Sequence, residues 1–299
     1  MFKPVFIMLV GLPGSGKSMF ANELEAIGFS VHSSDKIREE LFGSAEVQSD
    51  NDKVFKTIHK RIKCDLKNGK STVMDATNIS YKRRRAFLSE ISNIDCSKVC
   101  IVIATTIEKC KESNNGRDRK VPEYVIDRMY HNFDFPGYFE GWDNILLHYR
   151  KDDNYNDYNL GNLIGLTIDF DQKNYHHSLT LGNHLIKVGM QLLNDVALHY
   201  AGILHDVGKL KTQTFVNKKG ETSSVAHYYN HHNIGAYDSM FYLKEFDSNI
   251  KVDICTLIQW HMEPYFWVKE STKDKYKRIW GEELFNRIMR LHEADMNGK

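Results

Sequence analysis

A glycine-rich stretch in the first twenty residues restricts how this part of the chain can fold. Residues 11–18 read GLPGSGKS and match the P-loop pattern G-x-x-x-x-G-K-[ST] at each fixed position. An apolar run at 5–10 precedes the loop, and residues 19–27 can form an amphipathic helix that stops at Gly28. A buried strand, a glycine loop and a helix N-terminus together form a phosphate site, because backbone N–H groups and the helix dipole point at the anion.

The loop therefore predicts a nucleoside triphosphate site, with ATP and Mg²⁺ as cofactors. Lys17 would reach the β- and γ-phosphates, and the Ser18 hydroxyl would bind Mg²⁺. The alternative is a glycine turn that matches by chance, but the flanking strand and helix argue against it. The residues expected to contact the nucleotide are Gly11, Gly14, Ser15, Gly16, Lys17 and Ser18.

Composition narrows the class of protein. With 299 residues, 41% of them hydrophobic and 26% charged, the chain has room for two globular domains. It shows no membrane-length apolar run, no signal-peptide pattern and no C-x-x-C pair among its five cysteines, so a cytoplasmic protein without membrane contact is expected. The formal net charge of +1 does not support a broad basic surface, so any nucleic acid would bind through a local cluster.

The order of apolar and helical stretches changes near residue 150. The polar and turn-prone segment 151–159 marks this boundary. Before it, apolar strands alternate with helical stretches, which predicts an α/β domain with a parallel sheet over 1–150. After it no convincing βαβ unit appears, so a second domain of a different kind is expected over 151–299.

In the first half, two acids follow expected strands. The strand at 29–33 delivers Asp35 to the carboxyl edge of the sheet, where ligands bind in such folds, and the strand at 71–75 ends in Asp75. Asp35 could accept the proton of an attacking hydroxyl, or it could cap the helix at 36–42. Asp75 could support the Mg²⁺ shell or cap a turn. A fourth strand is expected at 98–104.

Two basic clusters complete the first half. YKRRR at 81–85 opens a helix and could grip a substrate phosphate or form an ordinary solvated face. RDRK at 117–120 lies in a polar stretch and could be a mobile loop whose arginines neutralise charge in the transition state, or a plain solvent loop.

Over most of residues 4–143 the chain resembles the P-loop polynucleotide kinases of nucleic-acid repair. The matching segments are GLPGSGKS at 11–18, SSDKIR at 33–38, DATN at 75–78 followed by Arg83-Arg84, and RDRKVPEYVIDRM at 117–129. The resemblance implies that Asp35 activates a 5′-hydroxyl and that Arg38 holds the neighbouring phosphate. It also implies that Arg117 and Arg119 contact the transferred phosphoryl group. Ser113-Asn114 stands where the family often has Arg-Asn, which leaves open which lid arginine acts.

The second half contains His205-Asp206 at the end of an apolar stretch, within AGILHDVGK at 201–209. Both side chains are costly to bury unless something coordinates them. A divalent metal such as Mn²⁺, Fe²⁺, Co²⁺, Ni²⁺ or Zn²⁺ suits imidazole and carboxylate ligands, whereas a lone histidine on an apolar helix is usually a core residue. Further candidate ligands are His184, His231, His261 and Asp295.

The pattern H…HD…H…H…D is similar to the HD phosphohydrolase superfamily over about 159–299. The resemblance implies an all-α bundle in which Asp206 bridges two metals. Lys209 could bind a phosphate oxygen or satisfy the dipole at a helix C-terminus. His176 or His177 could line the pocket or replace His184 as first ligand, and His227 and His232 are weaker rivals of His231. The implied ligands of the first metal are His184, His205, Asp206 and Asp295, and the second metal would add His231 and His261.

Together the two halves resemble RNA end-healing enzymes, in which one domain phosphorylates a 5′-OH and the other removes a 2′,3′-cyclic phosphate or 3′-phosphate. The resemblance implies RNA or DNA ends as substrates and an RNA ligase as a partner. Two alternatives stay open: a metabolite or nucleoside kinase fused to an HD nucleotidase, and a nucleotide-sensing regulator.

Overall fold

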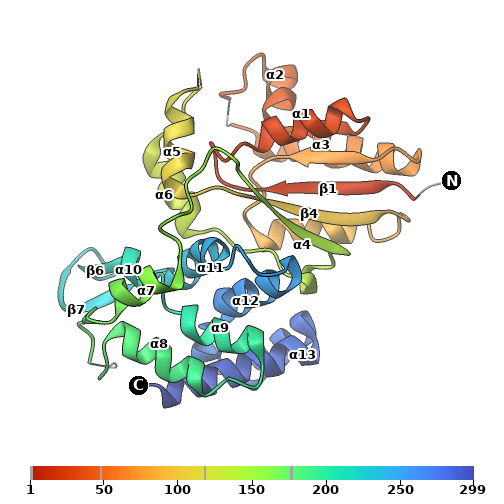
Figure 1. Ribbon diagram of the computed structural model, residues 1–299. Coiled ribbons are helices and arrows are strands. Elements are labelled where there is room, and N and C mark those ends of the chain that lie inside the picture. The colour runs from red at the N-terminus through yellow and green to blue at the C-terminus, as the bar shows by residue number, and fades with distance from the viewer. Residues whose placement is uncertain (1–2, 48, 118, 176–177) are drawn as a thin grey trace. The chain divides into compact units, whose positions relative to one another are not determined.

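A computed structural model of the chain describes residues 3–47, 49–117, 119–175 and 178–299 (Figure 1). Backbone contacts divide the chain into two compact units. Unit 1 contains Met1–Met129 and Pro136–Asp153, and unit 2 contains Tyr130–Phe135 and Asn154–Lys299. The short segment Tyr130–Phe135 therefore leaves the first unit and packs with the second.

Unit 1 is built on a parallel sheet, as the sequence predicts. Among the described residues the sheet has five strands in the order β2-β3-β1-β4-β5. The four expected strands are present, and the fifth, at the edge beside β4, was not foreseen. The strands are β1 (Val5–Val10), β2 (Ser30–Ser33), β3 (Thr72–Asp75), β4 (Ser97–Ala104) and β5 (Asn144–Tyr149).

Helices cover both faces of this sheet (Figure 1). Ile7 and Leu9 of β1 pack on one face with Ala21 of α1, whereas Phe6 meets Phe87 of α4 on the other at 5.2 Å between ring centroids. Burial on both faces explains why β1 is a continuous apolar run. The helices are α1 (Lys17–Ala26), α2 (Ser34–Phe42), α3 (Asn51–Lys67), α4 (Tyr81–Glu90), α5 (Ile107–Asn115), α6 (Glu123–His131) and the 3-10 helix η1 (Tyr138–Glu140).

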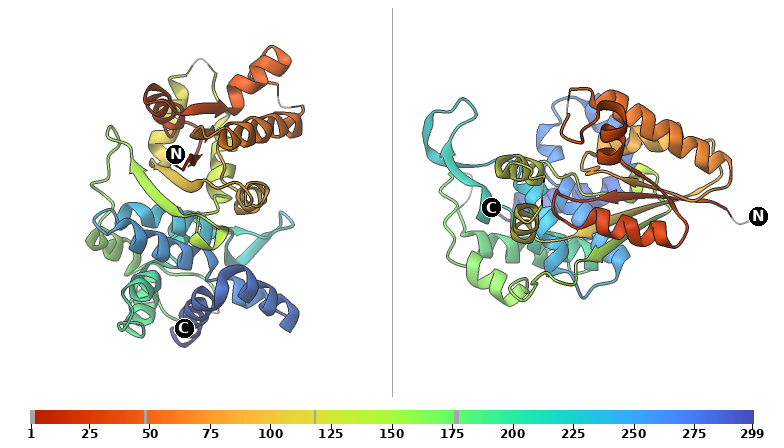
Figure 2. Two further views of the ribbon diagram at one scale, coloured as in Figure 1. Left: turned by 90° about the vertical axis from the view of Figure 1, so that its right-hand side faces the viewer. Right: turned by 90° about the horizontal axis from the view of Figure 1, so that it is seen from above.

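Unit 2 is mostly helical, but it also carries an antiparallel ribbon that the all-α expectation did not include. The ribbon pairs β6 (Gln213–Val216) with β7 (Thr222–Tyr228) and projects beyond the helices (Figure 2). Gly220, with φ of +84°, forms the turn between the two strands. The helices are α7 (Leu160–Thr167), α8 (Leu181–Met190), α9 (Val196–Leu204), α10 (Lys209–Thr212), α11 (His231–Tyr242), α12 (Ser248–Trp260), the 3-10 helix η2 (Glu263–Phe266) and α13 (Glu270–Asn297).

Two glycine contacts bring the elements of unit 2 close enough to form a site. A Cβ on Gly202 of α9 would lie 3.0 Å from the Cα of Gly189 on α8, so these helices approach closely. A Cβ on Gly208 would lie only 2.0 Å from the carbonyl oxygen of His231, so only glycine lets the segment after α9 pass the start of α11. These approaches draw residues 184, 205–206 and 231 together.

The remaining sequence expectations concern membranes and thiols. No helix within the described part of the chain combines the length and apolarity needed to cross a bilayer. The five cysteines are free; Cys64 is exposed and the other four are buried.

Candidate phosphate and metal sites

The P-loop adopts a conformation that requires its glycines. Gly14 and Gly16 have φ of +82° and +98°, in the left-handed region that other residues rarely occupy. A Cβ on Gly14 would also lie 2.1 Å from the carbonyl oxygen of Cys110. α1 begins at Lys17, so the loop leads directly into a helix N-terminus and its unpaired N–H groups.

The two residues after the last glycine of the loop, Lys17 and Ser18, make side-chain contacts close to the loop. The Lys17 ammonium donates to the carbonyl oxygen of Leu12 at 2.7 Å, and burial lowers its pKa to about 8. The Ser18 hydroxyl donates to a carboxylate oxygen of Asp75 at 3.0 Å. A hydroxyl beside a carboxylate is the oxygen donor set that Mg²⁺ prefers, so these residues fit that ion.

Arg150 is a P-loop contact that the sequence did not reveal. Its Nη1 donates to the carbonyl oxygen of Gly14 at 3.0 Å, and its guanidinium is held from the other side by Asp152 at 2.5 and 2.8 Å. The arginine follows β5, far along the chain from the loop, and no local motif marks it.

At the carboxyl edge of β2, the structure groups three of the expected residues. Asp35 lies in the first turn of α2, where Ser33 is the N-cap residue. One Asp35 carboxylate oxygen accepts from Arg38 at 2.8 Å and contacts Arg119 at 2.9 Å. Arg38 also donates to the side-chain oxygen of Asn51 at 2.8 Å, and within the described residues its buried Nε has no partner.

The other residues of the expected lid are outside this group. Arg117 is exposed, and Asp118 lies outside the described residues. The arginines at 117 and 119 therefore differ in their surroundings, because the structure brings only Arg119 to Asp35.

The proposal that the basic run 81–85 grips a substrate phosphate is wrong for Arg84. Its side chain is buried and makes a double contact with the Glu140 carboxylate, at 2.7 Å from Nε and 2.6 Å from Nη2. Its Nη1 donates to the carbonyl oxygen of Asn78 at 2.9 Å. The guanidinium is thus engaged inside unit 1, whereas Lys82 and Arg83 are exposed.

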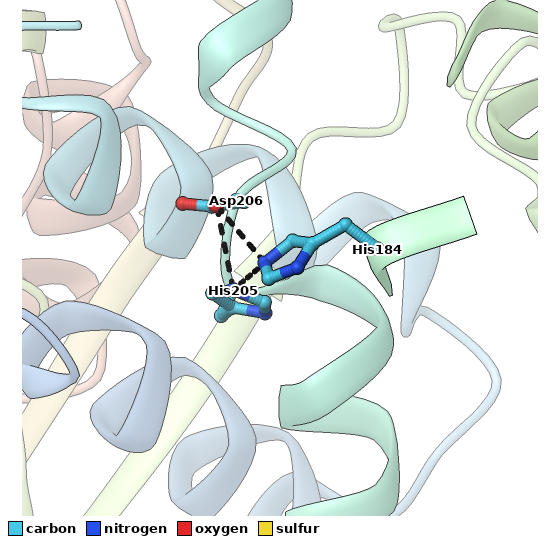
Figure 3. Close-up of side chains that lie close together, drawn as sticks. All are labelled: His184, His205 and Asp206. Atoms are coloured by element: carbon cyan, nitrogen blue, oxygen red, sulfur yellow. Dashed lines mark hydrogen bonds and ion pairs between the residues drawn. The ribbon is translucent and has the colours of Figure 1, made fainter. Parts of the chain in front are cut away.

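In unit 2 a buried cluster forms around Asp206 (Figure 3). One of its carboxylate oxygens lies 3.5 Å from Nε2 of His184 and 3.4 Å from Nε2 of His205. Asp295 adds a carboxylate oxygen 3.3 Å from Nε2 of His184 and 3.7 Å from that of His205.

The other carboxylate oxygen of Asp206 faces a second pair of imidazoles. It lies 3.0 Å from Nε2 of His231 and 3.6 Å from Nε2 of His261, and these two nitrogens are 3.4 Å apart. Asp206 therefore stands between two groups of potential ligands, His184 with His205 and His231 with His261.

The outer nitrogens of the four rings set their tautomers. Each Nδ1 lies against a backbone carbonyl oxygen, at 2.7 to 3.2 Å. A ring that donates from Nδ1 leaves the lone pair on Nε2, and all four Nε2 atoms point into the cluster. This donor set fits one or two divalent transition metals, since neutral imidazole and carboxylate are their usual ligands. The carbonyl partners belong to Gly298, Gly202, Tyr228 and Ile258.

The pKa values in the cluster are shifted by burial and by the charged groups packed together there. Burial lowers the pKa of His205, but Asp206 and Asp295 outweigh it and raise the pKa to about 10. Burial opposes ionisation of Asp206, yet Lys209 and His205 hold its pKa well below the usual range. Burial lowers the pKa of His261 despite its contact with Asp206. The cluster favours a positive charge at its centre.

Family comparisons match the two units separately. Residues 6–136 match the model of an AAA domain, and residues 174–295 match the model of the HD domain. The chain joins an AAA domain of the P-loop kinase type to an HD domain.

Similar proteins are known for the first domain. The L-seryl-tRNA(Sec) kinase of Methanococcus maripaludis is 28% identical over 148 residues, which are 46% of this chain and 56% of that protein. The chain thus spans about half the length of this curated relative.

Among the solved structures that resemble parts of this chain are an RNA repair complex and two kinases. A chain of the Pnkp1/Rnl/Hen1 RNA repair complex is 21% identical, with a TM-score of 0.40 and 43% of each chain covered. A fungal RNA kinase is 17% identical, with a TM-score of 0.37 over 51% of this chain and 79% of that one. A gluconokinase from Sinorhizobium meliloti 1021 is 16% identical, with a TM-score of 0.37 over 51% and 86%.

Around the HD cluster, the structure adds residues that the sequence did not single out. The Tyr265 hydroxyl donates to Asp295 at 2.7 Å. The Lys209 ammonium lies 2.6 Å from Asp206, donates to the side-chain oxygen of Gln172 at 2.7 Å and lies over the ring of Tyr228. Neither Tyr265 nor Gln172 belongs to a recognisable motif, because each reaches the cluster through tertiary packing.

In the HD domain the structure bears on Lys209 and on several of the expected histidines. Lys209 begins the one-turn helix α10, and its ammonium contacts the Asp206 carboxylate. His176 and His177 lie outside the described residues. Within the described residues, the two groups that could hold a metal include neither His227 nor His232, although the ring of His232 lies 6.5 Å from that of His261.

Proposed function

We propose that the protein heals the ends of broken nucleic acid with two activities. The AAA domain would transfer the γ-phosphate of ATP to a 5′-hydroxyl. The HD domain would hydrolyse a 2′,3′-cyclic phosphate or a 3′-phosphate. The observation that carries the kinase half is the group formed by Asp35, Arg38 and Arg119 at the carboxyl edge of the sheet that also bears the P-loop.

In the kinase reaction, Asp35 would take the proton of the attacking hydroxyl. The oxygen of that hydroxyl would bond to the γ-phosphorus of ATP as ADP departs. The Asp35 side chain is 58% exposed, so a substrate can reach it. Lys17 would place positive charge on the ATP phosphates. Arg38, which donates to Asp35, would hold the phosphate next to the attacking hydroxyl, and Arg119 would stabilise the charge on the transferred group.

In the hydrolase reaction, the six-residue cluster would hold one or two divalent metals among Mn²⁺, Fe²⁺, Co²⁺, Ni²⁺ and Zn²⁺. Such metals polarise a phosphate oxygen and lower the pKa of water. The protein's own part is to fix the ligands. Lys209 contacts Asp206, and Tyr265 donates to Asp295. The cluster consists of His184, His205, Asp206, His231, His261 and Asp295.

The relative named as an L-seryl-tRNA(Sec) kinase supports an RNA-borne hydroxyl as acceptor. The expected products, a 5′-phosphate and a free 3′-hydroxyl, are the ends that a ligase joins. An RNA ligase is therefore the class of partner that we propose. The same folds would also suit a metabolite or nucleoside kinase fused to a nucleotidase, or a nucleotide-sensing regulator, and the experiment must separate these.

The test offers the full-length protein γ-labelled ATP together with either a 5′-OH oligonucleotide or a free nucleoside. We expect label on the oligonucleotide; label on the nucleoside alone would make it a metabolite kinase. A second reaction follows the metal-loaded protein on an oligonucleotide ending in a 2′,3′-cyclic phosphate, with RNA and DNA versions compared. A protein that binds ATP but transforms neither end would be a regulator.

A further inference from the structure

Helix α3 presents a stripe of lysines to which the kinase chemistry described above gives no role. Lys53, Lys56 and Lys60 are spaced by three and four residues, so they share one face of the helix, with Thr57 between them. The three lysines are exposed, whereas the opposite face packs into unit 1. The stripe lines an open hollow of about 380 Å³, whose lining is Asp50, Asp52, Lys53, Lys56, Thr57 and Lys60.

This stripe, Lys53–Lys56–Lys60, begins beside the acceptor site of the kinase. Asn51, the first residue of α3, accepts a hydrogen bond from Arg38 at 2.8 Å, and Arg38 in turn holds Asp35. From Lys53 to Lys60 the helix then rises by about 10 Å. A linear ligand whose end lies at Asp35 could therefore continue along the stripe.

The lysines farther along the stripe are available for a ligand. Among the residues that the structure describes, Lys56 and Lys60 make no ion pair, whereas neighbouring cations do: Arg61 contacts Glu40 at 2.6 Å, and Lys63 contacts Glu90 at 2.7 Å. An unpaired pair of ammonium groups on one helix face complements a repeating anion.

The acids of the hollow lie at its other end, in the first turn of the helix. The Asp50 carboxylate caps α3 by accepting from the backbone N–H of Lys53 at 2.9 Å. Asp52 occupies the first helical turn, where the helix dipole favours a negative charge. The positive potential is therefore greatest toward Lys56 and Lys60.

We propose that the stripe binds the sugar–phosphate backbone of a single-stranded nucleic acid, on the 3′ side of the nucleotide whose 5′-hydroxyl faces Asp35. The inference rests on the proposed kinase function and deepens it by naming a polymer as its substrate. With a formal net charge of +1, the chain must contact a polyanion through a local cluster, and this one adjoins the acceptor site. Because contacts to phosphate carry no sequence information, the binding would be independent of sequence.

The experiment compares the double variant K56E/K60E with the unchanged protein on two acceptors, a 5′-OH ten-nucleotide strand and a nucleoside 3′-phosphate. Only the strand reaches the stripe. We expect its KM to rise about tenfold, since exposed charge pairs contribute up to about 1 kcal/mol each and reversal also adds repulsion. The KM of the nucleoside 3′-phosphate should rise far less. The slope of log KM against log salt should shrink by about 1.4, at about 0.7 per phosphate contact with a single strand.

A matched control reverses two exposed lysines near the far end of the helix, K67E/K70E, and should leave the KM of the strand unchanged. Fluorescence anisotropy of the labelled strand measures binding without catalysis. If the unchanged protein does not bind the strand, or if both double variants weaken binding equally, the stripe proposal is overturned. If K56E/K60E weakens binding of the strand and K67E/K70E does not, the stripe proposal is supported. If the unchanged protein then phosphorylates neither acceptor, the kinase function is overturned.

Discussion

The Nε2 atoms of His184 and His205 lie 3.1 Å apart, while Nδ1 of each ring faces a backbone carbonyl oxygen. With both Nδ1 atoms protonated, the two Nε2 lone pairs point at each other, which is unfavourable unless a cation accepts them. His231 and His261 repeat the arrangement at 3.4 Å. Two such pairs sharing the Asp206 carboxylate explain why the cluster can be buried at all: its donors are arranged for positively charged ligands.

Asp206→Asn should therefore strip the HD domain of its metal. The amide cannot present two anionic oxygens, one to each pair of histidines, so the loss in affinity should exceed the roughly 100-fold typical of outer partners of a metal ligand. Elemental analysis of the purified protein measures the metal content. Asp253→Asn, which alters a half-buried acid paired with Arg287 in the same unit, is the control and should keep its metal. Unchanged metal in the Asp206 variant would contradict the assignment.

Tyr265→Phe tests whether a hydrogen bond to the expected metal ligand Asp295 strengthens metal binding. The Tyr265 hydroxyl donates to Asp295 at 2.7 Å, and removing it should weaken metal affinity or hydrolysis by about 10- to 100-fold. A chelator titration gives the affinity, and a 2′,3′-cyclic phosphate substrate gives the activity. Tyr200→Phe, at a tyrosine whose ring packs on Phe246, is the matched control. Equal effects of the two variants would mean that the Tyr265 bond is irrelevant to the metal.

The sequence predicted those parts of the fold whose signal is local. The P-loop and its flanking elements occupy one continuous stretch, and β1 is apolar throughout because both of its faces are buried. β5 escaped prediction because it is an edge strand with mixed burial. The ribbon of β6 and β7 is only partly buried, and the β7 sequence TSSVAHY does not alternate polar with apolar residues as a half-buried strand does.

The sites show the same limit. Residue types and order pointed to the histidines and aspartates of the HD cluster. The run of bases at 81–85 could not reveal which side chain turns inward, since the partner of Arg84 is Glu140, which lies in η1. Arg150 and Tyr265 were missed for the same reason: each acts through a contact made only when the chain folds.

Asp35→Asn should abolish transfer to a 5′-hydroxyl while leaving hydrolysis of a 2′,3′-cyclic phosphate intact. Loss of a general base typically lowers the rate by about 10²- to 10⁴-fold. Labelled-phosphate transfer and cyclic-phosphate hydrolysis are measured on one preparation. Glu39→Gln removes an exposed acid one turn along α2 and should retain both activities. Loss of both activities in the Asp35 variant would mean that this residue supports folding and not proton transfer.

Arg150→Ala should weaken ATP binding by about tenfold. The guanidinium donates to the carbonyl oxygen of Gly14, and a hydrogen bond from a charged group contributes about 1.5–3 kcal/mol, which corresponds to at least tenfold in affinity. Equilibrium binding of a fluorescent ATP analogue gives the Kd. Lys151→Ala removes the adjacent, exposed cation and should leave the Kd unchanged. Equal weakening in both variants would indicate a general loss of positive charge instead of a specific contact.

His59 makes the stability of unit 1 depend on pH in the mildly acidic range. Burial lowers its pKa from 6.5, although the Glu90 carboxylate at 3.0 Å opposes the shift; Lys63, bound to the same carboxylate, adds to the lowering. The native state thus favours the neutral imidazole of His59. The centroid of this ring lies 4.3 Å from that of the Phe87 ring. A histidine pKa that is lowered in the native state contributes to the free energy of unfolding. This contribution is complete above pH 6.5 and is lost as the pH falls through the native-state pKa.

His59→Gln should consequently flatten this part of the stability profile, because glutamine does not titrate. Between pH 7.5 and 5.5 the unchanged protein should lose more stability than the variant, and hydrogen exchange of the α3 amides reports on unit 1 without requiring the whole chain to unfold in one step. His199→Gln, in unit 2, is the control and should leave the α3 profile as it is in the unchanged protein. If the His59 variant loses protection between these pH values as steeply as the unchanged protein, another group must be responsible, since the neutral ring would then have no advantage in the native state.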